Sequence, residues 1–341
     1  MSATPVTRAV AVALGAIVLQ FVVVAAFAWP AARLAPRHLP VVVAGPAAPA
    51  AAIAREISRT HPGAFRVITA TSAARARQDI TGRRAYGAIV VGGPSPLVLT
   101  ASAASPAVAQ LLTELAGQMA GAKPPARDVV PTDRDDPHGA AFGAMLLPLV
   151  ITSILGGALL VLAVGSVPGR IAGLVLFSVG GGAALAATAG SWLSILPGSY
   201  YAIAAIMGLI VLAVAATVTG LGSVAERAGR AAAGVGLGAA IMLVLGNPLS
   251  GATSAPELLP SPWGQVGQWL PPGAGATLLR AVAYFGGSRA GGPWAVLAAW
   301  AAAGLGLLAL SAVHRAGSAP PRAGAGGRAV TGEASALHVT S

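Results

Sequence analysis

Residues 9–29, AVAVALGAIVLQFVVVAAFAW, carry no charge and lie between Arg8 and Arg33. As a helix rising about 1.5 Å per residue, this run reaches about 30 Å, the thickness of a bilayer's hydrocarbon core. It also fits a cleaved signal peptide, because Ala26-Phe27-Ala28 resembles a cleavage site. The run is longer than the apolar part of a signal peptide, and Trp29 suits a membrane interface, so we favour a membrane anchor.

The composition of the whole chain also indicates a membrane protein. The 341 residues are 55% hydrophobic and 9% charged, whereas soluble proteins carry about 25% charged residues. The 45 glycines and 26 prolines favour close-packed or interrupted helices. The chain has no cysteine, which excludes disulfides, thiolate metal sites and cysteine nucleophiles.

Five further apolar runs are long enough to be considered as spans. From Gly139 to Ala225 the only charged residue is Arg170, and Pro- and Gly-containing breaks divide this stretch. We expect the five spans at 140–165, 171–193, 201–222, 231–246 and 294–313. With the first run, they predict an all-α six-helix transmembrane bundle.

The distribution of basic residues predicts the orientation, because short cytoplasmic segments collect Arg and Lys. With six spans and a cytoplasmic N-terminus, the short inner segments and the C-terminal tail hold two acids, Glu226 and Glu333, against seven arginines: Arg8, Arg170, Arg227, Arg230, Arg315, Arg322 and Arg328. The short loop 194–200 on the other side has no basic residue. We therefore expect a multi-pass plasma membrane protein with both termini in the cytoplasm.

Residues 31–138 predict an extracytoplasmic α/β domain inserted between spans one and two, followed by a stalk. Strand-like runs alternate with helical ones. The expected strands are 39–44, 65–69, 86–91 and 97–100, and the expected helices are 47–60, 71–82 and 104–121. The tract 123–138, with Asp133, Asp135 and Asp136, is typical of a solvated stalk.

The remaining segments complete the expected organisation. Residues 1–30 form the anchor, 139–246 hold four spans and 294–314 form the last span. Segment 247–293 is apolar but broken by prolines, so it predicts either short helices that re-enter the bilayer or an ordinary structured loop. Residues 315–341 predict a disordered cytoplasmic tail.

The sequence shows no catalytic or metal-binding pattern. No predicted span has an ionisable residue in its interior, and the five histidines are far apart and lack metal-ligand spacing. The chain has one lysine, Lys123, and no P-loop, nucleophile elbow or zinc helix. The arginines are scattered rather than gathered on one face, which argues against nucleic acid binding. We expect no enzyme activity, cofactor or metal.

The order of these parts resembles the ABC type-2 permease family, in particular an actinobacterial branch related to phage-infection-protein-like (YhgE/Pip) membrane proteins. The resemblance covers about residues 8–315. The stretches that carry it are Tyr86–Val91, Ala101–Gln110, Gly246–Gly251 and Trp269–Gly273, followed by Leu279-Arg280 and Tyr284-Phe285.

The resemblance implies a permease-like subunit of an exporter for a hydrophobic or amphipathic substrate, driven by a separate cytoplasmic ATPase and working as a homodimer or heterodimer in membrane lipid. Arg227 and Arg230 are candidate contacts for the ATPase. The alternative is a non-transporting envelope scaffold, or a phage- or secretion-related protein, that binds a partner through residues 31–138. Candidate outer-gate residues are Asn247, Pro248, Trp269, Pro271, Pro272, Gly273 and Arg280.

Overall fold

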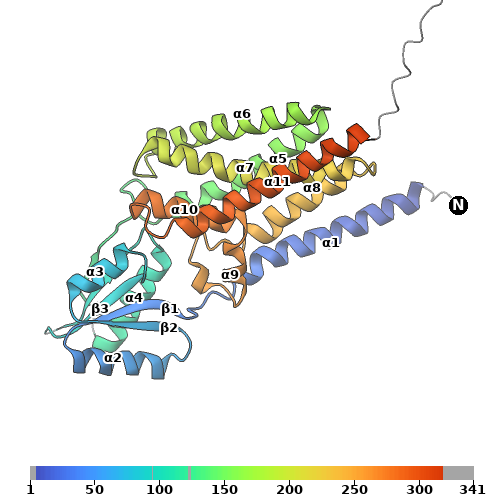
Figure 1. The fold of residues 1–341 in the computed structure, drawn as a ribbon. Coiled ribbons are helices and arrows are strands. Elements are labelled where there is room, and N and C mark those ends of the chain that lie inside the picture. Colours follow the sequence, from blue (N-terminus) through green and yellow to red (C-terminus); the bar gives the residue numbers. More distant parts are fainter. Residues whose placement is uncertain (1–4, 94, 122–123, 318–341) are drawn as a thin grey trace, which may run out of the picture.

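The computed structural model describes residues 5–317 except 94 and 122–123, and it is mostly helical (Figure 1). Within these residues, five helical stretches are long and apolar enough to span a membrane: α1 (Pro5–Ala31), α5 (Ala140–Ala163), α6 (Val167–Ala186) continued by the π-helix η1 (Ala187–Trp192), α7 (Tyr200–Glu226) and α11 (Gly291–Gly317). The predicted tail 315–341 lies outside the described residues from 318 onward.

The remaining predicted span, 231–246, is also helical but shorter than the others. It consists of α8 (Ala231–Ala239) continued by the π-helix η2 (Ala240–Gly246). An apolar stretch of this length reaches about 24 Å, less than the hydrocarbon core of a bilayer. The structure thus has five helices of spanning length and one short apolar helix.

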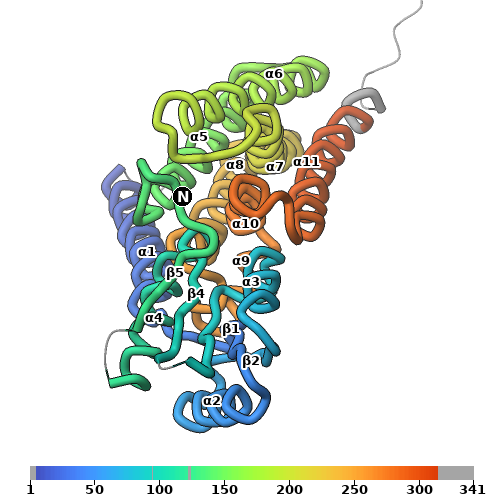
Figure 2. Tube along the Cα trace, turned by 90° about the vertical axis from the view of Figure 1, so that its left-hand side faces the viewer, coloured from blue at the N-terminus to red at the C-terminus, as the bar shows by residue number. Residues whose placement is uncertain are grey.

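Helix α7 is the centre of the bundle, and α5, α6, α8 and α11 surround it (Figure 2). Small residues let the helices approach closely. A Cβ placed on Gly182 of α6 would lie 2.7 Å from the Cα of Gly208 in α7, and one on Gly157 of α5 would lie 2.7 Å from the carbonyl oxygen of Ala215. Gly304 of α11 likewise faces the backbone of Ala216. Such backbone contacts are typical of helix packing in lipid.

Residues 39–128 form a five-stranded sheet with three helices, which we call the sheet region. The strands are β1 (Leu39–Ala44), β2 (Phe65–Ala70), β3 (Gly87–Val90), β4 (Leu97–Thr100) and β5 (Ala126–Asp128), in the order β2-β1-β3-β4-β5. β3 and β4 are antiparallel and the other pairs are parallel. Helices α2 (Ala47–Thr60) and α4 (Pro106–Ala120) cover one face, and α3 (Ala73–Thr81) covers the other.

Segment 247–293, the junction segment, joins the bundle to both faces of this sheet. It contains η3 (Pro256–Leu258), α9 (Trp263–Gln268) and α10 (Pro271–Tyr284). Ala255 and Leu258 pack into the apolar core under α2 and α4, whereas Phe285 packs into the core under α3. Leu278 and Leu279 of α10 belong instead to the core formed with α7. The junction segment is therefore shared by the sheet region and the bundle.

The exposed Trp and Tyr side chains lie at helix ends on the side of the bundle where the sheet region is attached (Figure 1). They are Trp29, Trp192, Tyr200, Tyr201, Trp263, Trp269 and Trp294. Trp29 and Trp263 meet edge to face, with ring centroids 6.4 Å apart. Exposed Trp and Tyr side chains at the ends of apolar helices are typical of a membrane interface.

Two interpretations from the sequence need correction. Arg170 is not in a loop but in the first turn of α6, where it is fully buried and its Nη1 donates to Glu226 Oε2 at 2.9 Å. Asp136 is not solvated: its carboxylate accepts from the backbone N–H groups of Ala141 and Phe142 and so caps α5. The tract assigned to a stalk also contains β5. Each charge lies at a helix end, where capping or ion pairing compensates for its burial.

The tight contact between α6 and α7 makes a direct prediction. Gly182→Ala should lower the free energy of unfolding by about 1–3 kcal/mol, because the added methyl group would enter the backbone of α7. Gly180→Ala, two residues away on the same helix, meets nothing within 4 Å and should be neutral or slightly stabilising. Thermal unfolding of the purified protein in detergent measures the difference. Equal effects of the two changes would contradict the packing described.

Candidate functional site

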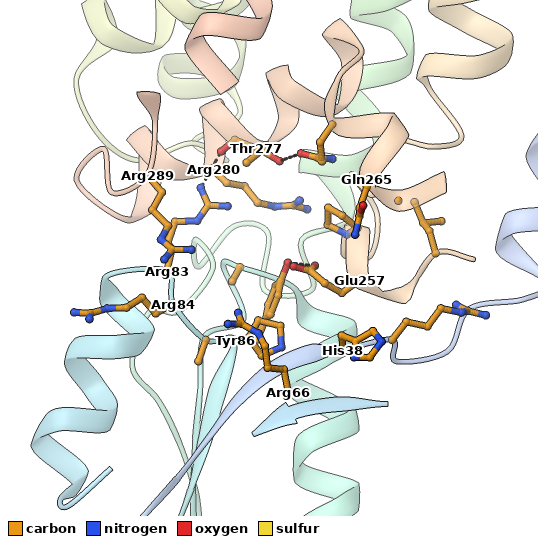
Figure 3. A pocket seen from close by; sticks show the side chains of 18 of the residues that line it. His38, Arg66, Arg83, Arg84, Tyr86, Glu257, Gln265, Thr277, Arg280 and Arg289 are labelled. Atoms are coloured by element: carbon orange, nitrogen blue, oxygen red, sulfur yellow. Dashed lines mark hydrogen bonds between the residues drawn. The ribbon is translucent and has the colours of Figure 1, made fainter. Parts of the chain in front are cut away.

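A cavity of about 680 Å³ lies between the sheet region and the junction segment (Figure 3). The sheet region and the loop that leads from α1 to β1 contribute arginines to its walls, and α10 and the loop after it contribute more. The charged residues that line it are Arg37, Arg66, Arg83, Arg84, Arg280, Arg289 and Glu257, with His38 beside them. Six arginines and one carboxylate residue thus line the cavity, so its lining is strongly cationic.

Arg280 is held at the upper wall by α10. This helix begins at Pro271-Pro272, where proline fits the first helical turn, and packs through Leu278 and Leu279 on α7. The Arg280 guanidinium lies 4.4 Å from the centre of the Phe142 ring and donates one hydrogen bond to the carbonyl oxygen of Ala252. Burial is the main reason that the pKa of Arg280 falls to about 10, so the group stays charged at neutral pH.

Arg83 reaches α10 from the sheet region. Its Nη1 donates to the backbone carbonyl of Thr277 at 2.9 Å, and its guanidinium lies 5.3 Å from the centre of the Phe285 ring. Burial lowers the pKa of Arg83, and nearby Arg289 lowers it further because the two positive charges repel. Figure 3 shows Arg83 and Arg289 side by side. A bound anion would relieve this repulsion.

Tyr86 and Glu257 form the opposite wall and connect β3 to η3. The Tyr86 hydroxyl donates to Glu257 Oε2 at 2.7 Å. Burial, followed by the charge of Glu257, raises the pKa of Tyr86 well above its usual value. The neighbouring backbone is also tied across the junction, since the Arg37 N–H donates to the Glu257 carbonyl at 2.9 Å. The Tyr86–Glu257 pair thus holds the two parts together beside the cavity.

The backbone is strained around this cavity. Among the described residues, four that are not glycine have positive φ, and three of them line the cavity: His38 at 52°, Arg83 at 54° and Arg289 at 58°. Left-handed backbone costs an ordinary residue about 1–2 kcal/mol. Strain of this kind clusters at binding and catalytic sites, which supports a functional role for the cavity.

The structure brings together only part of the predicted gate. Trp269 and Arg280 line the cavity. Pro271, Pro272 and Gly273 form the buried start of α10, and Pro272 packs against Gly246. Asn247 and Pro248 follow η2, away from the cavity lining. Of the predicted gate residues, Asn247, Pro248, Pro271, Pro272 and Gly273 therefore do not line this cavity.

Sequence reasoning missed most of the cavity. Arg37, Arg66, Arg83 and Arg289 come from four separate elements or loops, and their spacing in the sequence shows no pattern. The sequence contained one indication of the cavity. Glu257 is the only acidic residue in the junction segment, and a lone carboxylate in an apolar segment is expected to have a partner.

At the opposite end of the bundle, Arg227 and Arg230 lie in the exposed turn between α7 and α8. Arg227 donates a hydrogen bond to the carbonyl oxygen of Leu310 in α11. Arg170 and Glu226 lie at the same end. In the described part of the chain, no group of three histidine, aspartate or glutamate residues is placed to hold a metal ion.

Comparison of the chain with protein-family models, curated proteins and solved structures finds no match. The candidate site is therefore defined by its own geometry, which is a cationic cavity at the junction between an apolar helical bundle and a sheet region. In chemical terms the cavity can hold an anion, because guanidinium groups bind carboxylates and phosphates through several N–H donors at once.

The Tyr86–Glu257 hydrogen bond should stabilise the junction. Tyr86→Phe should lower the free energy of unfolding by about 1–3 kcal/mol, because the Glu257 carboxylate loses a donor. Tyr201→Phe is the matched control, since Tyr201 is 82% exposed and its hydroxyl makes no hydrogen bond within the described chain. Thermal unfolding in detergent distinguishes them, and equal melting temperatures for the two variants would contradict the role of Tyr86.

The Tyr86–Glu257 pair also predicts how the stability of the folded protein depends on pH. Because the pKa of Tyr86 is raised in the folded protein, its stabilising contribution is complete below the unfolded-state pKa of about 10. The contribution declines as the pH rises toward the raised value and is lost once the pH passes it. The difference in stability between the wild type and Tyr86→Phe should therefore be constant between pH 7 and 9 and shrink above pH 10, as measured by chemical unfolding. A difference that vanished between pH 7 and 9 would contradict this.

Proposed function

We propose that this protein is a permease-like membrane subunit that moves a hydrophobic or amphipathic substrate, with energy from a separate cytoplasmic ATPase. In this proposal, α8 and η2 complete a six-helix transmembrane bundle with the five longer helices. The sheet region forms an extracytoplasmic α/β domain inserted between spans one and two. The chain lies in the plasma membrane with both termini in the cytoplasm and works as a homodimer or heterodimer.

The observation that carries the proposal is the double contact of α10. On one side Gly275 faces Ile210 of α7, and Leu278 and Leu279 join the core of the bundle. On the other side Arg83 of the sheet region donates to Thr277 of the same helix. A shift of α7 in the membrane would therefore move α10 and change the cavity. Coupling of this kind is what an exporter needs to link its spans to an external binding site.

The far end of the bundle offers a surface for an ATPase. Arg227 and Arg230 are exposed in the α7–α8 turn. The buried Arg170–Glu226 ion pair, at 2.9 Å, joins the start of α6 to the end of α7 beside that turn. A force on the turn would thus be transmitted to two helices that contact the central core.

One observation favours the alternative, a scaffold or attachment protein that does not transport. The contacts of α7 with α5, α6 and α11 are backbone to backbone, which leaves little room for a path between these helices. If the protein is a permease, its substrate must cross the bundle outside these tight contacts of α7. Side chains along α1 are exposed, and α1 meets the bundle near η2, so that side is the better route.

Co-purification from mild detergent tests the permease proposal. An ATPase should be recovered with the full chain, and its turnover should depend on the chain. Arg230→Glu should weaken this association by about tenfold or more, because it reverses a charge in the exposed turn. Arg55→Glu, the same change on the exposed side of α2, should leave the association unchanged.

Two outcomes would contradict the permease proposal. The first is recovery of no nucleotide-hydrolysing partner under conditions that preserve a known ATPase–permease complex. The second is an equal effect of Arg230→Glu and Arg55→Glu. Capture of one defined partner that is lost when the exposed surface of the sheet region is altered would support the scaffold alternative.

A further inference from the structure

The cationic cavity holds more positive charge than its own residues neutralise. Arg84 pairs with Asp79 at 3.2 Å, and Arg37 donates to the carbonyl oxygens of Leu258, Ala35 and Arg33. The side chains of Arg66 and Arg289 are exposed at the cavity and make no hydrogen bond or ion pair within the described residues. These two guanidinium groups are free to bind a ligand.

Two more guanidinium groups are fixed but only partly used. A guanidinium carries five N–H donors. Arg83 gives one to Thr277 and Arg280 gives one to Ala252, and aromatic rings hold both groups in place. Four arginines, two fixed and two free, therefore surround the cavity. A phosphate group has several acceptor oxygens and up to two negative charges, and it matches this arrangement better than a single carboxylate does.

The cavity also has an apolar border beside the exposed aromatic side chains. Trp269 and Pro293 line it, and Trp269 is 72% exposed. Trp263 and Trp294 belong to the same group of exposed aromatics, which marks the membrane interface. A ligand held by its charged group among the arginines could extend an acyl chain past Trp269 into lipid.

We propose that the junction cavity binds the phosphate group of an anionic ligand, and that Arg66 and Arg289 close around it while Arg83 and Arg280 form the fixed floor. The same chemistry is offered by a phospholipid head group and by a soluble phosphate ester. The position of the cavity at the aromatic level favours the lipid. Binding requires no ATPase and no transport, so it can be tested separately from the permease proposal.

The strained backbone at Arg289 supports a binding role for this residue. A left-handed φ of 58° is easy for glycine and unfavourable for arginine, yet the Arg289 side chain makes no stabilising hydrogen bond or ion pair in the described structure. An arginine that only supported the fold would gain nothing from this position. Interaction with a ligand explains why a charged side chain is presented there.

Binding can be measured with the purified full chain and two probes. The lipid probe is radiolabelled phosphatidic acid in mixed micelles, compared with phosphatidylcholine, and the soluble probe is radiolabelled glycerol phosphate. We expect phosphatidic acid to bind at least about tenfold more tightly than phosphatidylcholine. The double variant Arg66→Gln/Arg289→Gln should weaken that binding by about tenfold or more, since the loss of one charge-assisted contact already costs about a factor of ten.

Matched variants separate the site from general charge and from folding. Arg55→Gln/Arg127→Gln removes the same charge from exposed positions of the sheet region that do not line the cavity, and it should change binding by less than about twofold. Arg289→Gly removes the side chain and relieves the left-handed strain, so it should bind phosphatidic acid more weakly while its melting temperature stays equal or rises.

The outcomes are distinct. Binding of glycerol phosphate as tight as that of phosphatidic acid would support the site and identify a soluble ester as its ligand. Equal binding of phosphatidic acid and phosphatidylcholine together with no binding of glycerol phosphate would overturn the proposal. An equal loss in the two double variants would overturn it too, because the effect would then be one of overall charge.

Discussion

The exclusion of charge from the bilayer core determines how this chain is arranged. The long apolar helices keep their charged residues at their ends, and where a charge is buried it has partners. Arg170 illustrates this at the far end, where Glu226, Ser223 and two backbone carbonyls accept from its guanidinium. Charge is thereby concentrated at two levels, one at the turn around Arg227 and the other at the junction cavity.

The junction segment connects the sheet region to the helical bundle. Its apolar residues enter three separate cores, one with α7 and one on each face of the sheet. Packing of one segment into three cores distinguishes the junction segment from an ordinary surface loop. Because the same short helices carry Arg280 and Glu257, the shape and charge of the cavity depend on how the bundle holds α10. The permease proposal and the proposed anion site both rest on this physical connection.

The long apolar helices and most strands could be predicted from the sequence because their signals are local. Apolar length indicated α1, α5 and α7, and alternating strand-like and helical runs indicated the order of the sheet region. The cavity could not be predicted, since Arg66 and Arg289 approach it only after the junction segment folds back on the sheet. The cap by Asp136 was also missed, because three nearby aspartates in a Pro-rich tract are typical of solvated chain. Left-handed φ at an arginine has no signature in sequence at all.

The central claim is that the sheet region and the α7–α8 turn lie on opposite sides of the membrane. The chain contains no cysteine, so single cysteines can be placed at exposed Ala48 of α2 and exposed Ala228 of the turn. A membrane-impermeant thiol reagent applied to intact cells should label the protein at position 48 and leave position 228 unlabelled until the cells are opened. Labelling at 228 with none at 48 in intact cells would contradict the account.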